Sequence, residues 1–315
     1  MNKINKELQI LGVVAFFTLF LYWGVEPFAH SQMHKHVEGE GFAYSEFKAS
    51  GKKGNVENGK VLVTGAGACT GCHGIKAINS PAPMDASMSG ASYGVNPPDL
   101  STAGALYNAK FLAELIKNPA HALKVEHKFD PAKGKMHPMA QFYGAGGDMD
   151  QEIADMVAFL KSIAPKEMTN KEAYVDACSR CHANRYGKLT QIGETTKFKY
   201  KKDELAHQIK VLDYQDSLKK YMGKLPPDLS IIIRARSEHF LETFIENPQS
   251  QLVGTSMPAV GLSHEGFEKV IAYLGETGDP SKPARGELGP WVIIFFVVFS
   301  GLAFLWKKEK WRGHH

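Results

Sequence analysis

Apolar residues gather at the two ends of the chain. The run LQILGVVAFFTLFLYWGV covers residues 8–25, and the run GPWVIIFFVVFSGLAFLW covers residues 289–306. Both runs lack charged residues and are about 18 residues long, which is close to the shortest helix that crosses a bilayer. The pattern predicts two transmembrane helices: an N-terminal anchor with its juxtamembrane turn at 1–29, and a C-terminal helix at 286–308.

Positive charge flanks both runs on the side of the chain ends. Lys3 and Lys6 precede the first run, and KKEKWR at 307–312 follows the second. Because positive flanks stay in the cytoplasm, we expect both termini there, a basic cytoplasmic tail at 309–315, and residues 30–285 in the periplasm of a bacterial inner membrane. The tryptophans near the run ends fit interfacial positions: Trp23, Trp291 and Trp306. A cleaved signal peptide is the alternative for the first run, and a buried core helix for the second.

Between the two runs, one order of features occurs twice. NPPDLSTAGALYNAKFLAELIKNPAHAL covers 96–123, and LPPDLSIIIRARSEHFLETFIENPQSQL covers 225–252. Each copy ends in a segment with apolar residues at helical spacing, at 150–163 and 264–277. A repeat of this length indicates that one helical domain has been duplicated.

All four cysteines lie in two copies of the pattern Cys-x-x-Cys-His. The members are Cys69, Cys72 and His73 in the first copy, and Cys178, Cys181 and His182 in the second. In this pattern two thiols add to the vinyl groups of a haem, and the histidine ligates the iron. The sequence therefore predicts two covalently bound c-type haems, one in each copy.

Other uses of paired cysteines explain the pattern less completely. A zinc site of four cysteines gives no reason for a histidine after each pair. A thioredoxin-like redox pair needs a βαβ setting, and two disulfides need no such spacing. The length of 315 residues allows about two domains, and a net charge of only +4 gives no indication of nucleic-acid binding.

The repeated part of the chain resembles class I cytochromes c. The shared features are Cys-x-x-Cys-His on an early helix, a Pro-x-Leu loop, a methionine, and a last helix that ends in Ala-Tyr/Phe-Leu. The resemblance covers nearly all of 56–165 and 170–278. It implies an all-α fold with two tandem class I cytochrome c domains, at 56–165 and 166–280, after a linker at 30–55.

The resemblance also implies the remaining haem contacts. A methionine ahead of the last helix would be the sixth iron ligand, which is Met257 in copy two. In copy one the position falls on Met139, with Met136 and His137 as alternatives. A proline carbonyl would bind the second ring nitrogen of each axial histidine. By position these prolines are Pro98 and Pro227.

Two inserted segments depart from the repeat. One covers 124–135, and the other covers 186–224 and contains a predicted polar helix in its middle, from 203 to 222. We expect both insertions to be surface excursions. Arg234 and Arg236 suit either haem propionates or a solvent-exposed role.

The layout as a whole resembles the dihaem c1-type subunit of some bacterial quinol–cytochrome c reductase (bc) complexes. This resemblance implies an electron-transfer subunit, not catalytic alone, that passes electrons from a Rieske iron–sulfur protein to a periplasmic cytochrome c or an oxidase. The implied partners are cytochrome b, the Rieske protein, the acceptor and membrane lipid, in a dimeric complex. The alternatives are the dihaem subunit of a high-affinity haem–copper oxidase, and a dihaem enzyme of the thiosulfate dehydrogenase or cytochrome c peroxidase type.

Overall fold

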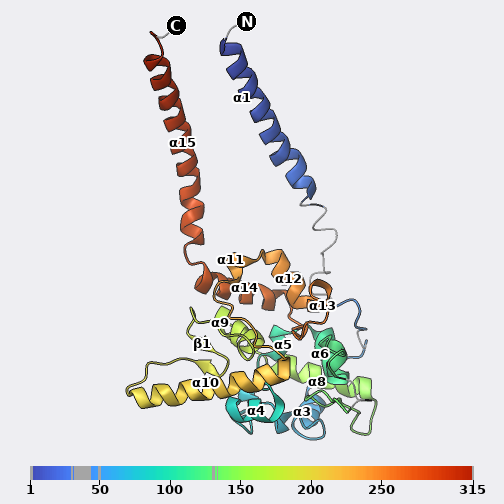
Figure 1. Cartoon of the computed structure of the whole chain (residues 1–315). Helices are drawn as coiled ribbons and strands as arrows, with labels where there is room; N and C mark the ends of the chain where they lie inside the picture. Colours follow the sequence, from blue (N-terminus) through green and yellow to red (C-terminus); the bar gives the residue numbers. More distant parts are fainter. Residues whose placement is uncertain are drawn as a thin grey trace.

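A computed structural model shows a helical body from which two long helices project (Figure 1). The described residues are 3–29, 31, 44–48, 51–129, 132 and 134–313. Most of the histidine-rich segment 30–36, which suits either a metal site or a juxtamembrane linker, lies outside them. The predicted helical fold is confirmed, and the described residues add one small antiparallel sheet, β1 (Leu189–Thr190) with β2 (Gly193–Glu194).

The first copy is built around two crossing helices, α3 (Val56–Thr64) and α8 (Met149–Ile163). Gly59 makes the crossing close, because a Cβ there would overlap the carbonyl group of Asp155. Buried residues of both helices, Leu62, Val63, Met156 and Phe159 among them, form the core of this copy. The remaining helices are η2 (Cys69–Gly71), η3 (Lys76–Ile78), α4 (Ala86–Tyr93), α5 (Ala103–Leu106), α6 (Ala109–Lys117) and α7 (Pro119–Ala122).

The second copy repeats this order around α9 (Asn170–Tyr174) and α14 (His264–Gly278). The helix predicted at 264–277 is therefore present, as is the one predicted at 150–163. The remaining helices are η5 (Val175–Ser179), α10 (Lys201–Met222), α11 (Ile232–Ala235), α12 (Glu238–Glu246) and α13 (Pro248–Gln251).

The two copies share one hydrophobic core. Leu106 and Phe111 from copy one lie in the same buried cluster as Leu262 and Phe267 from copy two. Backbone bonds cross the boundary, for example from the Ser263 N–H to the Leu106 carbonyl at 2.9 Å. The segment expected as a linker also joins this core through two buried aromatic residues, Tyr44 and Phe47. The relative position of the copies is thus set by packing rather than by a free connection.

The prediction that both insertions are surface excursions is wrong for the inner face of α10. Tyr214, Leu218 and Met222 are buried, and Tyr214 packs on α4, where a Cβ at Gly90 would lie 2.6 Å from its ring. The first insertion contacts the second, because Lys128 donates to the carbonyl of Tyr221 at 2.8 Å. The second insertion is rich in lysines, but it also contains apolar residues at spacing i, i+4, i+8. These residues form a stripe that packs against copy one.

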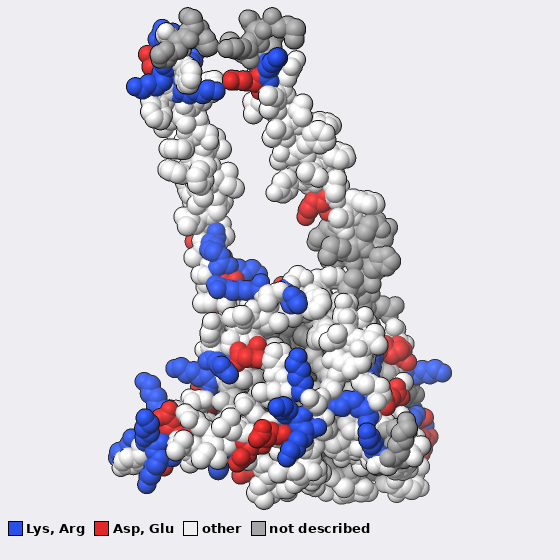
Figure 2. All heavy atoms as spheres, in the orientation of Figure 1, with Lys and Arg blue, Asp and Glu red and all other residues white. Residues whose placement is uncertain are grey.

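Two helices among the described residues are long and apolar enough to cross a membrane, at Lys6–Ala29 and Lys282–Lys310. The first comprises most of α1 (Lys3–Phe20) and η1 (Leu21–Val25), and the second is α15. Figure 2 shows the middle of both shafts without charged residues, and charged residues at their far ends and again near the body. There Lys307 lies 3.3 Å from Glu7, which places the two chain ends side by side.

An aspartate at the foot of α15 fixes that helix to the body. Asp279 accepts from Arg285 at 2.6 and 2.8 Å and from Arg234 at 3.0 Å. Arg234, which the sequence leaves between a propionate and solvent, thus pairs with a carboxylate of its own copy. The Arg285 guanidinium, with Arg234, holds the pKa of Asp279 well below its usual range.

Replacing Asp279 by asparagine should loosen the root of α15 without unfolding the body. A carboxylate whose pKa is lowered on folding stabilises above its unfolded pKa of about 3.9, and this contribution is lost as pH falls through the folded value. Hydrogen exchange of backbone amides near residue 282 should therefore accelerate at pH 7 in Asp279→Asn. Glu287→Gln, an exposed carboxylate on the same helix, is the control. Equal exchange in both variants would remove Asp279 from this role.

Candidate functional site

Each Cys-x-x-Cys-His motif is a tight turn that brings its three side chains together. In copy one the Cys72 N–H donates to the Cys69 carbonyl at 3.2 Å, and the His73 N–H to the same carbonyl at 2.9 Å. The corresponding distances in copy two, to the Cys178 carbonyl, are 3.1 and 2.9 Å. The two motifs therefore have one backbone geometry.

The histidine of each motif is held by a proline carbonyl. His73 Nδ1 lies 2.8 Å from the Pro98 oxygen, and His182 Nδ1 lies 2.8 Å from the Pro227 oxygen. A carbonyl only accepts, so Nδ1 carries the hydrogen and Nε2 carries the lone pair that can bind a metal. The structure thus brings both predicted prolines to both predicted axial histidines.

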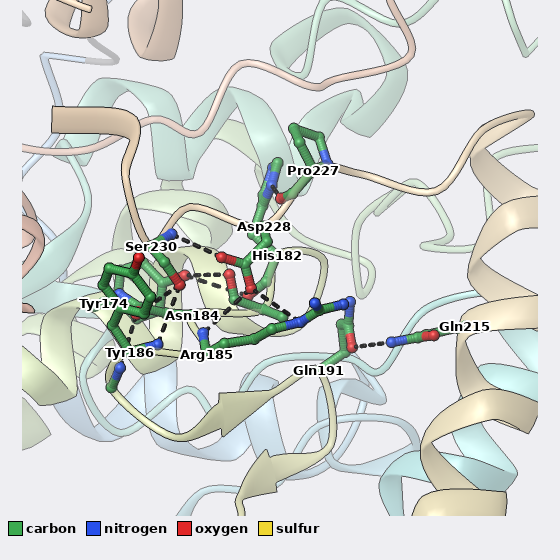
Figure 3. A network of polar contacts seen from close by, with 12 residues as sticks. Tyr174, His182, Asn184, Arg185, Tyr186, Gln191, Gln215, Pro227, Asp228 and Ser230 are labelled. Carbon is green, nitrogen blue, oxygen red and sulfur yellow. Dashed lines mark hydrogen bonds and ion pairs between the residues drawn. The ribbon is translucent and has the colours of Figure 1, made fainter. Parts of the chain in front are cut away.

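The residues after each proline pair clamp the loop that follows the histidine. In copy two, Asp228 accepts from the Ser230 N–H at 2.9 Å and from the Arg185 N–H at 3.2 Å (Figure 3). The Ser230 hydroxyl accepts from the Tyr186 N–H at 3.1 Å, and the Leu229 N–H donates to the Ala183 carbonyl at 2.9 Å. These bonds join the segment that follows Pro227 to the loop that follows His182, and so they fix the Pro227 carbonyl relative to the His182 ring.

Copy one has the same clamp, bond for bond. Asp99 accepts from the Ser101 N–H at 2.9 Å and from the Lys76 N–H at 3.4 Å. The Ser101 hydroxyl accepts from the Ala77 N–H at 2.9 Å, and the Leu100 N–H donates to the Gly74 carbonyl at 2.9 Å. Sequence reasoning singled out only the prolines, although the repeated Pro-Pro-Asp-Leu-Ser already marked the aspartate and the serine.

The two serines should differ in their effect on stability. Ser230 is 4% exposed and its hydroxyl bonds both the Tyr186 N–H and Asn184 Oδ1, so Ser230→Ala removes buried bonds that water cannot replace and should cost about 1–2 kcal/mol. Ser101 is half-buried, and water can replace its hydroxyl, so Ser101→Ala should cost less than about 1 kcal/mol. Urea unfolding of the haem-loaded variants measures both. Equal losses would show that burial does not set the strength of this bond.

Burial keeps the ligating groups neutral. It lowers the pKa of His73 and of His182, so both imidazoles are uncharged at neutral pH, as metal ligation requires. Burial also raises the thiol pKa of Cys69 and Cys181, and that of Cys178 to about 12.

The alternative uses of the cysteines find no support in the structure. All four cysteines are free thiols, so neither pair forms a disulfide. Within the part of the chain that the structure describes, no group of three or more His, Cys, Asp or Glu residues is placed to hold a metal ion.

The predicted sixth ligands lie in unlike surroundings. Met257 and Cys178 are both partly buried and pack against the same hydrophobic cluster. Met139 is half-buried, and its backbone N–H donates to His137 Nδ1 at 3.1 Å. The alternative Met136 is 65% exposed. Met149, which the sequence analysis did not consider, packs in the cluster of Cys69.

The two motifs are joined by one buried tyrosine. The Tyr214 hydroxyl accepts from the Asn96 N–H at 3.0 Å and donates to the Arg180 carbonyl at 2.8 Å. Asn96 lies two residues before Pro98, and Arg180 two residues before His182. This single side chain therefore connects the loop that orients the first histidine with the motif that carries the second.

Comparison with known proteins identifies the first copy. Residues 56–164 match the cytochrome c family, so a cytochrome c domain is present and implies covalently bound haem c. The ammonia monooxygenase gamma subunit of Nitrosomonas europaea is 29% identical over 133 residues, which cover 30% of this chain and 57% of that protein. The match thus spans little more than half of the relative. A solved hyperthermophilic respiratory complex III has a chain with 25% identity and a TM-score of 0.36, over 45% of this chain and 74% of that one.

Proposed function

We propose that this chain is a membrane-anchored dihaem cytochrome c that carries electrons in a respiratory chain. The observation that carries the proposal is the repetition of one site. Copy one lies in the matched cytochrome c domain, and copy two reproduces its histidine–proline bond at the same 2.8 Å, together with the Asp and Ser clamp. A geometry that serves haem c in the first copy supports a second haem c in the other.

The chain's own residues would hold and orient each cofactor. Cys69 and Cys72 would form the thioethers of the first site, and Cys178 and Cys181 those of the second. Bound haem c supplies a one-electron iron couple. The histidines would ligate through Nε2 while Nδ1 stays bonded to the proline carbonyl, which fixes the ring and increases its basicity. Met139 and Met257 would complete the coordination, and a thioether opposite histidine raises the potential.

The anchors support a place beside integral membrane subunits. We propose that the haem domains lie in the periplasm, with both termini in the cytoplasm, because basic residues follow the second apolar run and the chain ends lie together. We further propose a quinol–cytochrome c reductase of the bc type, in which cytochrome b and a Rieske protein supply the electrons. A helix that follows the second haem domain supports this assignment over the oxidase subunit, whose anchors precede the haem domains.

Three measurements test the proposal. Intact mass of the purified chain should exceed the polypeptide mass by two haems, and a redox titration should resolve two one-electron steps. Native purification should yield a cytochrome b and a Rieske protein. A mass increase of one haem would reject the dihaem assignment, and copurification with a copper oxidase would move the chain to that complex.

A further inference from the structure

We propose that the outer face of α10 docks an acidic, soluble electron carrier, to which the second haem site delivers its electron. The inference rests on the proposed function. It assigns a role to an insertion that the first copy lacks.

The outer face of α10 is apolar although it faces solvent. Leu205, Ile209 and Leu212 are 57%, 51% and 59% exposed. They follow one another at spacing i, i+4, i+7, so they form one stripe, and it lies opposite the buried face of Tyr214 and Leu218. The buried residues of α10 are Tyr214, Leu218 and Met222, and none of the residues 201–213 is buried, so the stripe takes no part in packing the helix on the body. Exposed apolar side chains bordered by polar residues mark interaction sites.

The surroundings of the stripe are positively charged. The segment 197–224 contains eight lysines and four acidic residues, a net charge of +4 that equals the net charge of the whole chain. Lys201 and Lys202 precede the stripe along α10, and Lys219 and Lys220 follow it. Figure 2 shows lysine and arginine side chains crowded over this end of the body. An apolar centre with a basic rim fits a partner with an apolar centre and an acidic rim.

The position of α10 selects a soluble partner. The helix crosses the side of the body opposite to α1 and α15 (Figure 1), so the two candidate membrane spans point away from it. A membrane surface is therefore not its occupant. A second copy of the chain is disfavoured as well, because a two-fold contact would place two equal basic rims against each other.

The inner face of α10 leads directly to the second motif. Cys181 packs against the cluster of Tyr214, Leu218 and Met222, and the Tyr214 hydroxyl bonds the Arg180 carbonyl at 2.8 Å. Ile209, in the middle of the stripe, precedes Leu218 by nine residues, so a docked carrier would lie roughly 14 Å along the helix from the centre of this cluster and on the opposite face of a helix roughly 10 Å thick. In the transfer the carrier would gain one electron, and haem c held by Cys178, Cys181 and His182 would supply it. No bond forms or breaks, and no proton moves.

The test uses the full-length, haem-loaded protein, reduced and mixed with two oxidised probes of opposite charge: an acidic plastocyanin and a basic mitochondrial-type cytochrome c. The charge-reversal variant changes Lys201, Lys202, Lys219 and Lys220 to glutamate. Its rate constant with plastocyanin should fall at least about tenfold at low salt, and that with the basic cytochrome should rise. Both changes should vanish near 1 M salt, where the Debye length is about 3 Å.

The matched control reverses four exposed lysines that lie outside α10: Lys53, Lys60, Lys161 and Lys166. A second variant, Ile209→Gln, keeps all charges and should lower the plastocyanin rate several-fold at every salt concentration. Equal effects of the two charge reversals, or no effect of Ile209→Gln, would overturn the docking site. Haem content and potentials are measured in each variant, so one haem in the unaltered chain would instead reject the proposed function.

Discussion

Replacing Cys178 and Cys181 together by alanine should leave a chain with one covalent haem and no transfer to a soluble acceptor. Both thiols are half-buried in the motif of His182, whose Nδ1 is bonded to Pro227, so this motif has no other means of covalent attachment. Intact mass should fall by one haem, and the redox titration should lose one step. The rate of plastocyanin reduction should fall to the background rate of nonspecific reaction at the protein surface.

The matched control is the double variant Cys69→Ala and Cys72→Ala. It should also lose one haem, but it should keep transfer from the chemically reduced second site to plastocyanin, because α10 packs on Cys181. If the Cys178 and Cys181 variant kept its full mass, the second copy would not bind haem covalently. If the two double variants lost acceptor reduction alike, the electron would not leave through the second site.

The prediction of the helices succeeded where one periodicity determined one buried face. Ile153, Met156 and Leu160 in α8 follow the i, i+3, i+7 spacing, and the corresponding residues of α14 do the same, so helix and core followed from one pattern. In α10 the spacing of Tyr214 and Leu218 coexists with a second stripe on the opposite side. Because two apolar faces with lysines between them give no single apolar period along the sequence, the helix was predicted to be polar and its buried face was not predicted.

Prediction of the candidate sites from the sequence was limited in the same way. Cysteine and histidine positions followed from the motif, because covalent attachment dictates their order along the chain, and the proline positions followed from the resemblance to class I cytochromes c. The contact between the copies did not, since Leu106 and Phe111 would be core residues in an isolated domain too. The bridge from Asn96 through Tyr214 to Arg180 joins residues more than 30 positions apart. No local sequence pattern predicts a contact between residues so far apart in the chain.

The two sites therefore share the hydrogen bonds around their histidines and differ in the protein that surrounds them. Each histidine, proline, aspartate and serine makes the same bonds in both copies. What differs is the protein around them: Ser230 is more deeply buried than Ser101, and only the second motif lies under α10. Because burial and nearby charge tune a haem potential while axial ligands set its range, we expect two distinct potentials from one ligand set.

Replacing Gly59 by alanine should destabilise the first copy more than any surface change near its motif. A Cβ at this position would overlap the Asp155 carbonyl group and stand 2.8 Å from the Phe159 Cβ, so α3 and α8 would have to separate. Overpacking of this kind costs about 3 kcal/mol when backbone must move. For a body of about 200 residues this lowers Tm by roughly 6–12 °C. Thermal unfolding followed by the absorbance of the haem-loaded protein measures it.

Gly71→Ala is the control, because it lies inside the first Cys-x-x-Cys-His motif and a Cβ there meets no atom within 4 Å. It should change Tm by less than about 2 °C, since exposed substitutions away from packed positions stay within roughly 0.5 kcal/mol. The loss in Gly59→Ala should also be confined to one of the two haem signals, because α9 and α14 form the corresponding crossing of the other copy. A simultaneous loss of both signals would instead mean that the shared core makes the two copies unfold as one unit.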